Sequence, residues 1–428
     1  MRLSLILLLC LISPAWPQTA QDHWVATWTT AQPLIRIQPG SRPAAAPSTP
    51  ATPSAASQPA PPARPPASPQ QRIMAQGFHN QTIRMIVHTS IGGSRMRIRL
   101  SSPFGSAPVE VGSAHVALRS KESETVPSSD HALSFNGKPG CTIGPGMVIL
   151  SDPLDFTVPS QGDIAVSLYF PGETGPPSAH NGLHTSYVSN EGDATAAAAI
   201  PDATAAPAYY WLEAVDVIAP ARTSLIVAFG DSITEGARST PDTNHTWPAA
   251  LSARLAANKS TANIAVANMG IGGNRVLRDI AGASALARFD RDILSQPGAK
   301  WVMMLEGIND IGRGNIEPVS ADDLIGAYKQ IIERAHTHGI KVIGCTLTPY
   351  EGANYARHEG EAIREAVNTW IRTGRAFDGV VDFEAATRDP NDPKRLRADF
   401  DPGDHLHPND AGYQAMANAV DLAMFAGK

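Results

Sequence analysis

From residue 225 onward, five short apolar runs alternate with amphipathic helical patterns. Apolar runs without polar alternation are typical of strands that are buried on both faces of a parallel sheet. Regular alternation with helices predicts an α/β fold, with helices on both faces of the sheet and every strand's carboxyl end at one edge. The predicted strands cover residues 225–230, 263–268, 301–306, 341–346 and 380–383, and the predicted helices cover 247–255, 320–339, 363–371 and 410–424.

Polar and small residues follow four of these strands in the sequence. Past the first, second, third and last strand come Ser232, a glycine-rich turn at 268–274, Asn309, and the pair Asp404 and His407. Ligands in open α/β folds bind beyond the carboxyl ends of the strands. The four loops are therefore expected to meet at one site.

The residue types at this edge suit acyl transfer. A serine hydroxyl is a weak nucleophile until a base removes its proton, and His407 can be that base for Ser232. Asp404, three residues before the histidine, can hold the second ring nitrogen. The backbone N–H groups of Ser232 and Gly273 and the side-chain amide of Asn309 can stabilise the oxyanion that develops.

These four blocks resemble those of the SGNH (GDSL) hydrolase superfamily over residues 222–428, in the family's order and with no block missing. The resemblance implies a flavodoxin-like three-layer α/β/α domain and an ester hydrolase that needs no cofactor and no metal. It also implies the site roles. These are the nucleophile Ser232, the oxyanion donors Ser232, Gly273 and Asn309, and the other triad members Asp404 and His407.

Two alternatives concern the same blocks. Gly272 competes with Gly273 for the oxyanion position, and the family pattern fits Gly273 better. His405 and His407 with Asp404 also have the spacing of zinc ligands, but no further His or Cys cluster stands nearby. The triad therefore explains His407 better than a metal site does.

Three further residues are candidates for substrate contact, namely Asp231, Tyr350 and Arg275. Asp231 more simply orders the turn before the serine, and Tyr350 follows the fourth strand near the functional edge. Arg275 has solvation or helix capping as an equal alternative. In the first half of the chain, His180 and His184 can reach the site only across a domain boundary, and we interpret them as loop residues without function.

The first half of the chain follows a β pattern. Residues 82–88 and 95–100 alternate apolar and polar side chains around Gly92 and Gly93, which predicts a hairpin with one apolar face. The arginine row at 95, 97 and 99 is then expected on the solvated face. Short runs punctuated by Pro and Gly continue to about residue 215, while 194–208 reads as a loop. An all-β, sandwich-like domain is predicted.

The chain begins like an exported protein. One arginine, a ten-residue apolar core and a small, polar stretch are typical of a cleaved secretory signal, so we expect a secreted or periplasmic protein. The domains predicted from these patterns are a signal peptide at 1–20, the β-domain at 21–218 and the hydrolase domain at 219–428. A Pro- and Ala-rich segment at 39–70 is predicted to be a disordered loop within the β-domain.

Charge and composition exclude some classes of binding partner. A net charge of -6 and a pI near 6.1 argue against nucleic acid, and no segment after the signal has the length and apolarity of a membrane span. Cys141 and Cys345 fall in separate domains, which favours two free thiols over a bridge. The sequence does not determine the oligomeric state.

Residues 82–90 and 99–105 resemble a secreted bacterial branch of the superfamily that carries an N-terminal β-domain. The branch implies a serine esterase that removes acetyl groups from plant-wall carbohydrate such as xylan, with an acetylated polysaccharide or oligosaccharide as its partner. A lipase, arylesterase or thioesterase acting on lipophilic acyl esters is the alternative enzyme. The alternative that is not an enzyme is a glycan-binding protein on an inactive hydrolase scaffold.

Overall fold

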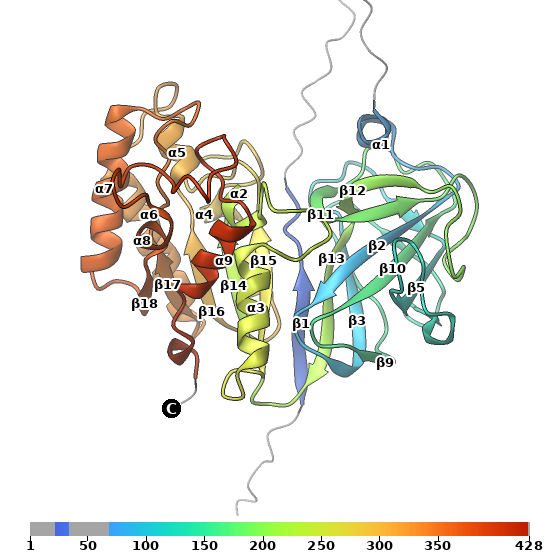
Figure 1. Cartoon of the computed structure of the whole chain (residues 1–428). Coiled ribbons are helices and arrows are strands. Elements are labelled where there is room, and N and C mark those ends of the chain that lie inside the picture. The colour runs from blue at the N-terminus through green and yellow to red at the C-terminus, as the bar shows by residue number, and fades with distance from the viewer. Residues whose placement is uncertain (1–21, 34–67, 427–428) are drawn as a thin grey trace, which may run out of the picture.

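A computed structural model describes residues 22–33 and 68–426. Figure 1 shows an N-terminal part made mostly of antiparallel strands beside a C-terminal α/β domain. The predicted signal peptide and most of the predicted loop at 39–70 lie outside the described residues. Within those residues, no helix has both the length and the apolarity needed to span a membrane.

The C-terminal domain contains a five-stranded parallel sheet, as predicted. The strands lie in the order β15-β14-β16-β17-β18, so the second strand in sequence is at the edge and the first lies beside it. This is the flavodoxin-like order, whose functional edge is at the carboxyl ends of the strands. The strands are β14 (Ser224–Gly230), β15 (Ile264–Gly270), β16 (Ala299–Leu305), β17 (Lys341–Cys345) and β18 (Gly379–Val381).

Helices cover both faces of this sheet (Figure 1). Helices α3 (Trp247–Ala257) and α9 (Asp410–Asn418) pack against each other on one face. Helices α4 (Ala285–Phe289), α6 (Ala321–Thr337) and α7 (His358–Thr373) form the other group. Shorter helical segments fall in the loops, as α2 (Ser232–Glu235), η2 (Asp290–Leu294), α5 (Ile308–Gly312), α8 (Phe383–Thr387) and η3 (Leu422–Met424).

Local sequence explains where the main helices begin. Thr246 accepts a hydrogen bond from the N–H of Ala249, and Pro248 occupies the first turn of α3, where its missing N–H costs nothing. In α6 the side chains of Ser320 and Asp323 exchange bonds with each other's backbone N–H as a capping box.

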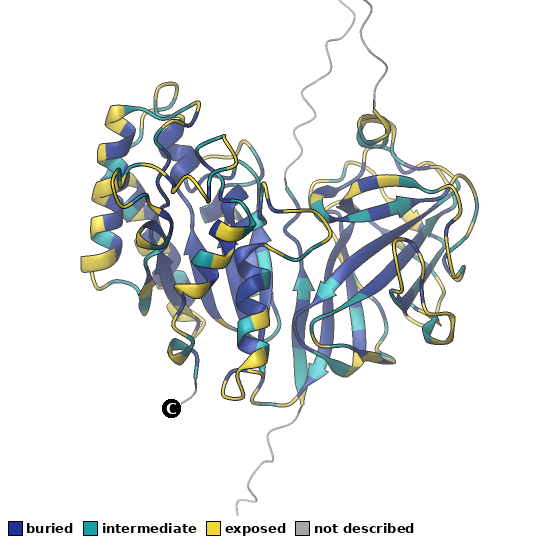
Figure 2. Ribbon diagram, in the orientation of Figure 1, coloured by how far each residue is buried: buried dark blue, intermediate teal, exposed yellow. Residues whose placement is uncertain are grey.

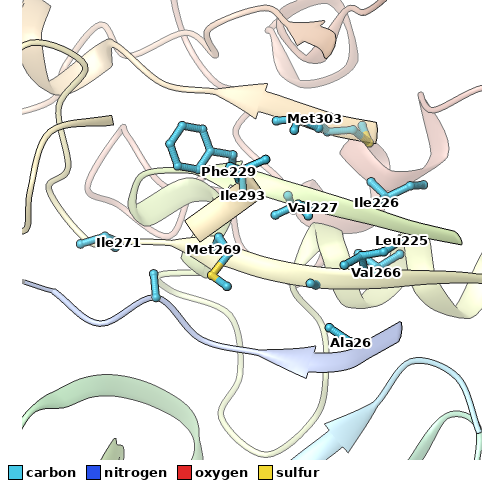
Figure 3. Packing of buried hydrophobic residues seen from close by; sticks show 14 of the residues in the cluster. Ala26, Leu225, Ile226, Val227, Phe229, Val266, Met269, Ile271, Ile293 and Met303 are labelled. Atoms are coloured by element: carbon cyan, nitrogen blue, oxygen red, sulfur yellow. The ribbon is translucent and has the colours of Figure 1, made fainter. Parts of the chain in front are cut away.

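Strand β14 lies at the centre of the core. Its residues from Leu225 to Phe229 have no exposed surface, which is why the run is apolar without alternation. Figure 3 shows these side chains against Val266 and Met269 of β15 and Met303 of β16. Figure 2 shows the same contrast over the whole domain, with buried strands inside helices whose outer surfaces are exposed.

The N-terminal part contains two large antiparallel sheets. One has the order β1-β13-β3-β8, with β9 also paired to β3, and the other has the order β12-β11-β2-β10-β5-β6. The first sheet comprises β1 (His23–Thr29), β3 (Gly93–Ser101), β8 (Val148–Leu150), β9 (Leu154–Val158) and β13 (Leu212–Ala219). The second comprises β2 (Gln81–Thr89), β5 (Ser113–Leu118), β6 (His131–Ala132), β10 (Gly162–Phe170), β11 (Ala179–Val188) and β12 (Thr204–Tyr210).

Smaller elements complete this part. Strands β4 (Val109–Val111) and β7 (Cys141–Ile143) form a two-stranded sheet, and η1 spans Pro127–Ser129. Helix α1 (Pro69–Gln76) begins within the last residues of the segment predicted as a disordered loop. Strand β12 lies partly in the stretch 194–208 that we expected to be a loop. Cys141 and Cys345 are both free.

The predicted hairpin around Gly92 and Gly93 is wrong. Strand β2 pairs with β10 and β11, whereas β3 pairs with β13, β8 and β9, so the chain passes from one sheet to the other between them. Both glycines are needed for close approach. A Cβ on Gly92 would lie 2.8 Å from the carbonyl oxygen of Val158, and one on Gly93 would lie 2.8 Å from the Cβ of Val217.

The arginine row on β3 is not a solvated face. The side chains of Arg97 and Arg99 are only 19% and 6% exposed, and both pair with Asp216 of β13, at 3.0 and 3.3 Å. Arg99 also donates a hydrogen bond of 2.5 Å to Gln296, which belongs to the α/β domain. The α/β domain therefore covers part of this face, and alternation along β3 alone cannot reveal that cover.

Replacing Arg99 by alanine is expected to lower the free energy of unfolding by about 3–5 kcal/mol, because it leaves the buried carboxylates of Glu213 and Asp216 without this cation. Arg95→Ala is the matched control on the same strand. Its pair with Asp155 is exposed and is expected to contribute at most about 1 kcal/mol. Urea denaturation measures both, and equal losses would contradict the buried role of Arg99.

Candidate active site

The predicted nucleophile lies at a tight turn between β14 and α2. Asp231 caps this short helix by accepting a hydrogen bond from the N–H of Ile233 at 2.9 Å. Gly230 is required because a Cβ there would lie 2.1 Å from the Thr234 hydroxyl and 2.5 Å from the carbonyl oxygen of Leu305. The turn holds Ser232 at the sheet edge with 8% of its surface exposed.

A single loop brings Asp404 and His407 to this serine. Nε2 of His407 lies 2.8 Å from Oγ of Ser232, and Nδ1 of His407 lies 2.9 Å from Oδ2 of Asp404. The other oxygen of Asp404 accepts hydrogen bonds from the N–H groups of Leu406 and His407, at 3.1 and 3.0 Å. Arg238 donates to Oδ2 of Asp404 at 2.8 Å.

The electrostatics of this loop keep Asp404 ionised. Burial by itself would raise the pKa of the carboxyl group, but hydrogen bonds from His407, Arg238 and Leu406 together lower the pKa below its usual value. An ionised carboxylate holds the imidazole in the tautomer that presents a bare Nε2 to the serine hydroxyl.

The sequence predicts three oxyanion donors, namely the N–H groups of Ser232 and Gly273 and the side-chain amide of Asn309. Gly273 has a φ of 74°, which favours glycine. Among the hydrogen bonds of the described residues, the N–H groups of Ser232 and Gly273 have no acceptor. The amide nitrogen of Asn309 donates one proton to the carbonyl oxygen of Asn274 at 3.0 Å, and its second lies toward Asp231 at a longer 3.4 Å.

Tyr355 sets the orientation of the Asn309 amide. Its hydroxyl donates to Oδ1 of Asn309 at 3.3 Å, so the nitrogen is left facing Asn274 and Asp231. Burial raises the pKa of Tyr355 well above its ordinary value, and the charge of Asp231 adds to the effect. The phenol therefore stays protonated and remains a donor.

One buried arginine joins the loops that carry these groups. Arg288 is 1% exposed and donates to the carbonyl oxygens of Gly230 and Met269, at 2.9 and 2.8 Å. It also donates to the Asn274 side chain at 2.9 Å and pairs with Glu306 at 3.1 Å. The guanidinium thus contacts the ends of β14, β15 and β16 at once.

The other three candidates for substrate contact are buried, and each makes contacts with other residues of the protein. Asp231 is 1% exposed and caps α2, which agrees with an ordering role in the turn. Tyr350 is also 1% exposed and packs beside Tyr355, so it presents no free face to a sugar ring. Arg275 is 4% exposed and pairs with Glu317.

The structure also shows the positions of His405, His407 and Asp404, whose spacing in the sequence is that of zinc ligands. His405 lies 2.5 Å from Asp401 through Nδ1, separately from the pair formed by Asp404 and His407. Among the residues that the structure describes, no group of three or more His, Cys, Asp or Glu side chains is arranged to hold a metal ion.

Several contacts of the site were not predicted. Arg238, Arg288 and Tyr355 lie outside the four blocks, and no spacing rule connects them to the groups they hold. His180, interpreted from sequence as a loop residue without function, pairs with Glu235 at 3.1 Å. Glu235 is the last residue of α2, so the N-terminal part touches the nucleophile turn directly.

Comparison with known proteins finds a family match for the C-terminal half of the chain. Residues 228–415 match the model of the GDSL-like lipase/acylhydrolase family. These residues belong to that family. This matched region, the GDSL domain, contains all the catalytic candidates, and its membership of an acylhydrolase family supports a carboxylic ester hydrolase. No curated protein matches the chain.

Solved structures similar to the GDSL domain include a G-D-S-L family protein from Desulfitobacterium hafniense DCB-2 that is described as lipolytic. It is 22% identical, with 48% of this chain and 100% of that chain covered and a TM-score of 0.36. Another is an acetyl-xylooligosaccharide esterase from Geobacillus Stearmophilus. It is also 22% identical. The match covers 48% of this chain and 95% of that chain, with a TM-score of 0.38.

The buried carboxyl group of Asp231 generates a pH prediction. Burial, together with the charges of Asp310 and Glu235, raises its pKa to about 7. The hydrogen bond from the N–H of Ile233 lowers the pKa but does not outweigh burial. The folded state then keeps a proton that the unfolded state releases near pH 4. The free energy of unfolding is therefore expected to fall as the pH rises from about 4 to about 7, and this contribution is lost above that range.

Asp231→Asn imitates the protonated carboxyl and keeps a good helix cap. The variant is expected to show a flatter pH dependence and to be more stable than the unchanged protein above pH 7, as measured by urea denaturation from pH 4 to 8. Asp421→Asn, at the exposed cap of η3, is the control. An unchanged slope in Asp231→Asn would contradict the prediction.

Proposed function

We propose that this chain is a secreted serine esterase that removes short acyl groups, above all acetyl, from carbohydrate such as xylan. The observation that carries the proposal is the hydrogen-bonded series Ser232–His407–Asp404, with distances of 2.8 and 2.9 Å, beside N–H groups that have no acceptor. Membership of residues 228–415 in an acylhydrolase family supports the same reaction class.

In the first half of the proposed reaction, Oγ of Ser232 attacks the ester carbonyl and its proton passes to Nε2 of His407. The carbonyl oxygen becomes an oxyanion that accepts hydrogen bonds from the N–H groups of Ser232 and Gly273 and from Nδ2 of Asn309. The tetrahedral intermediate then collapses. The bond to the leaving alcohol breaks, the alkoxide takes the proton from His407, and an acyl-serine remains.

In the second half, water replaces the alcohol. His407 removes a proton from the water as its oxygen attacks the acyl-serine, and the same donors hold the new oxyanion. Collapse breaks the bond between Oγ and the acyl carbon, and the proton on His407 returns to Ser232. The carboxylic acid leaves and the free enzyme is restored, with Asp404 ionised throughout to stabilise the imidazolium.

In this proposal the acyl group is small. The side chains that form hydrogen bonds with Ser232 or with the proposed oxyanion donor Asn309 are those of Asp231, His407 and Tyr355. A long acyl chain gains its binding free energy from apolar surface, at about 25 cal/mol per Å². The predicted export signal, which lies outside the described residues, would deliver the enzyme to polymeric substrates outside the cell.

The proposal predicts that Ser232→Ala releases no acid from acetylated xylan or from p-nitrophenyl acetate. Asn309→Ala is expected to lower kcat by about 10²–10³, because one donor to the oxyanion is lost while the nucleophile stays in place. Asn391→Ala, at an exposed asparagine of the same domain, is the control. Steady-state kinetics and thermal melting of each variant separate loss of catalysis from loss of folding.

A series of p-nitrophenyl esters from acetate to palmitate decides between the candidates. Activity that falls steeply beyond short chains, with acetate released from xylan, supports the proposal. A preference for long chains with xylan untouched would identify a lipase instead. Equal inactivity of the unchanged protein and Ser232→Ala on every ester would favour the inactive glycan-binding scaffold.

A further inference from the structure

A cavity of about 110 Å³ lies between the N-terminal part and the GDSL domain. Its walls come from β1, β2 and β11 on one side and from α3, β15 and the segment after α2 on the other. Asn181, Thr240 and His245 line it and are exposed, so the cavity opens to solvent. Its volume approaches that of a cavity of about 150 Å³ that holds a benzene ring.

The ionisable groups around this cavity are paired within the protein. Four histidines line it, and each lies near its own carboxylate. The pairs are His88 with Asp163 at 2.7 Å, His180 with Glu235 at 3.1 Å, His184 with Asp242 at 3.4 Å and His245 with Asp410 at 2.9 Å. No lysine or arginine is among the described residues that line it. An anionic ligand would find no free cation there, so the cavity suits a neutral ligand.

The uncharged lining combines an aromatic ring with hydrogen-bonding groups. Trp28 is half-buried and is held edge-on against Tyr209, with ring centroids 4.7 Å apart. Amide side chains from both parts of the chain, Asn181 and Asn244 among them, and hydroxyl groups such as Thr240 complete the lining. A rigid ring beside amides and hydroxyls suits a compact molecule with apolar faces and a rim of hydroxyl groups.

The cavity shares a wall with the nucleophile turn without including the triad. Glu235, which ends the helix that Ser232 begins, lines the cavity, and so does Asn268. Nδ2 of Asn268 donates to the carbonyl oxygen of Thr234 at 2.8 Å, within the same turn. Ser232 and His407 do not line it. A ligand bound here would therefore lie behind the turn that presents the serine.

We propose that this cavity binds one neutral sugar residue of a glycan, at a site apart from the triad. The inference rests on the proposed function for the class of ligand, while the cavity, its paired ionisable groups and its lining stand independently of it. It gives the N-terminal part a role in substrate recognition, because that part supplies Trp28, His180 and Asn181 to the cavity.

The test uses the full chain carrying Ser232→Ala and titrates it with unacetylated xylotetraose by isothermal calorimetry. Ala249 lines the cavity from α3, and Ala249→Phe fills the space without removing a polar group. Ala253→Phe, one turn further along the same helix at an exposed position outside the cavity, is the matched control. Affinity is expected to fall at least tenfold in Ala249→Phe and to change less than twofold in Ala253→Phe.

Equal affinity in the two phenylalanine variants would overturn the inference, as would the absence of binding by xylotetraose, cellotetraose and mannotetraose. If thermal melting shows that Ala249→Phe does not fold, Asn181→Ala replaces it, again with Asn391→Ala as control and with weaker binding as the expected result. Sugar binding that depends on the cavity in a protein inactive on p-nitrophenyl acetate would support this inference and contradict the proposed function alone.

Discussion

The geometry of the candidate site depends on the buried guanidinium of Arg288. Its donors bind the carbonyl oxygens at the ends of β14 and β15, the Asn274 side chain and the carboxylate of Glu306 beyond β16. A charge with no exposed surface is tolerated only because carboxylates and carbonyl oxygens satisfy it. The turn that carries Ser232 and the loops that carry Asn274 and Asn309 are therefore all held close to one buried group.

The N-terminal part meets the same site from the edge of the parallel sheet. Strand β1 packs against β15, and the N–H of Ala26 donates to the carbonyl oxygen of Pro297. Farther along the interface, His180 reaches Glu235 at the end of the nucleophile helix. Contacts of this kind connect the β-sheets of the N-terminal part to the short helix that begins at Ser232.

Sequence patterns predict the fold and the meeting of the four loops because both follow from the strands. Once five buried runs alternate with helices, parallel order and right-handed crossovers bring the residues that follow the strands to one edge. Nothing comparable selects a partner for β2 or β3. A period of two identifies the buried face of a strand but leaves open which strand lies beside it, and the predicted hairpin is wrong for that reason.

The burial of Arg99 and the contacts of Arg288 and Tyr355 cannot be predicted from a local sequence pattern, for a related reason. Arg99 looks solvated along β3 because the alternation does not reveal the domain that covers it. Arg288 and Tyr355 act through single contacts with residues far along the chain, and each occupies a stretch that an ordinary surface helix or loop could also contain. Long-range contacts of this kind require coordinates.

The compact loop that carries both Asp404 and His407 has a consequence for synthesis. The acid and the base are three residues apart and share backbone hydrogen bonds, whereas the serine lies 175 residues earlier. A growing chain therefore makes the proposed nucleophile long before the proposed base. In the proposed mechanism the serine hydroxyl is not activated until this late loop docks, and the contact between Ser232 and His407 completes the triad.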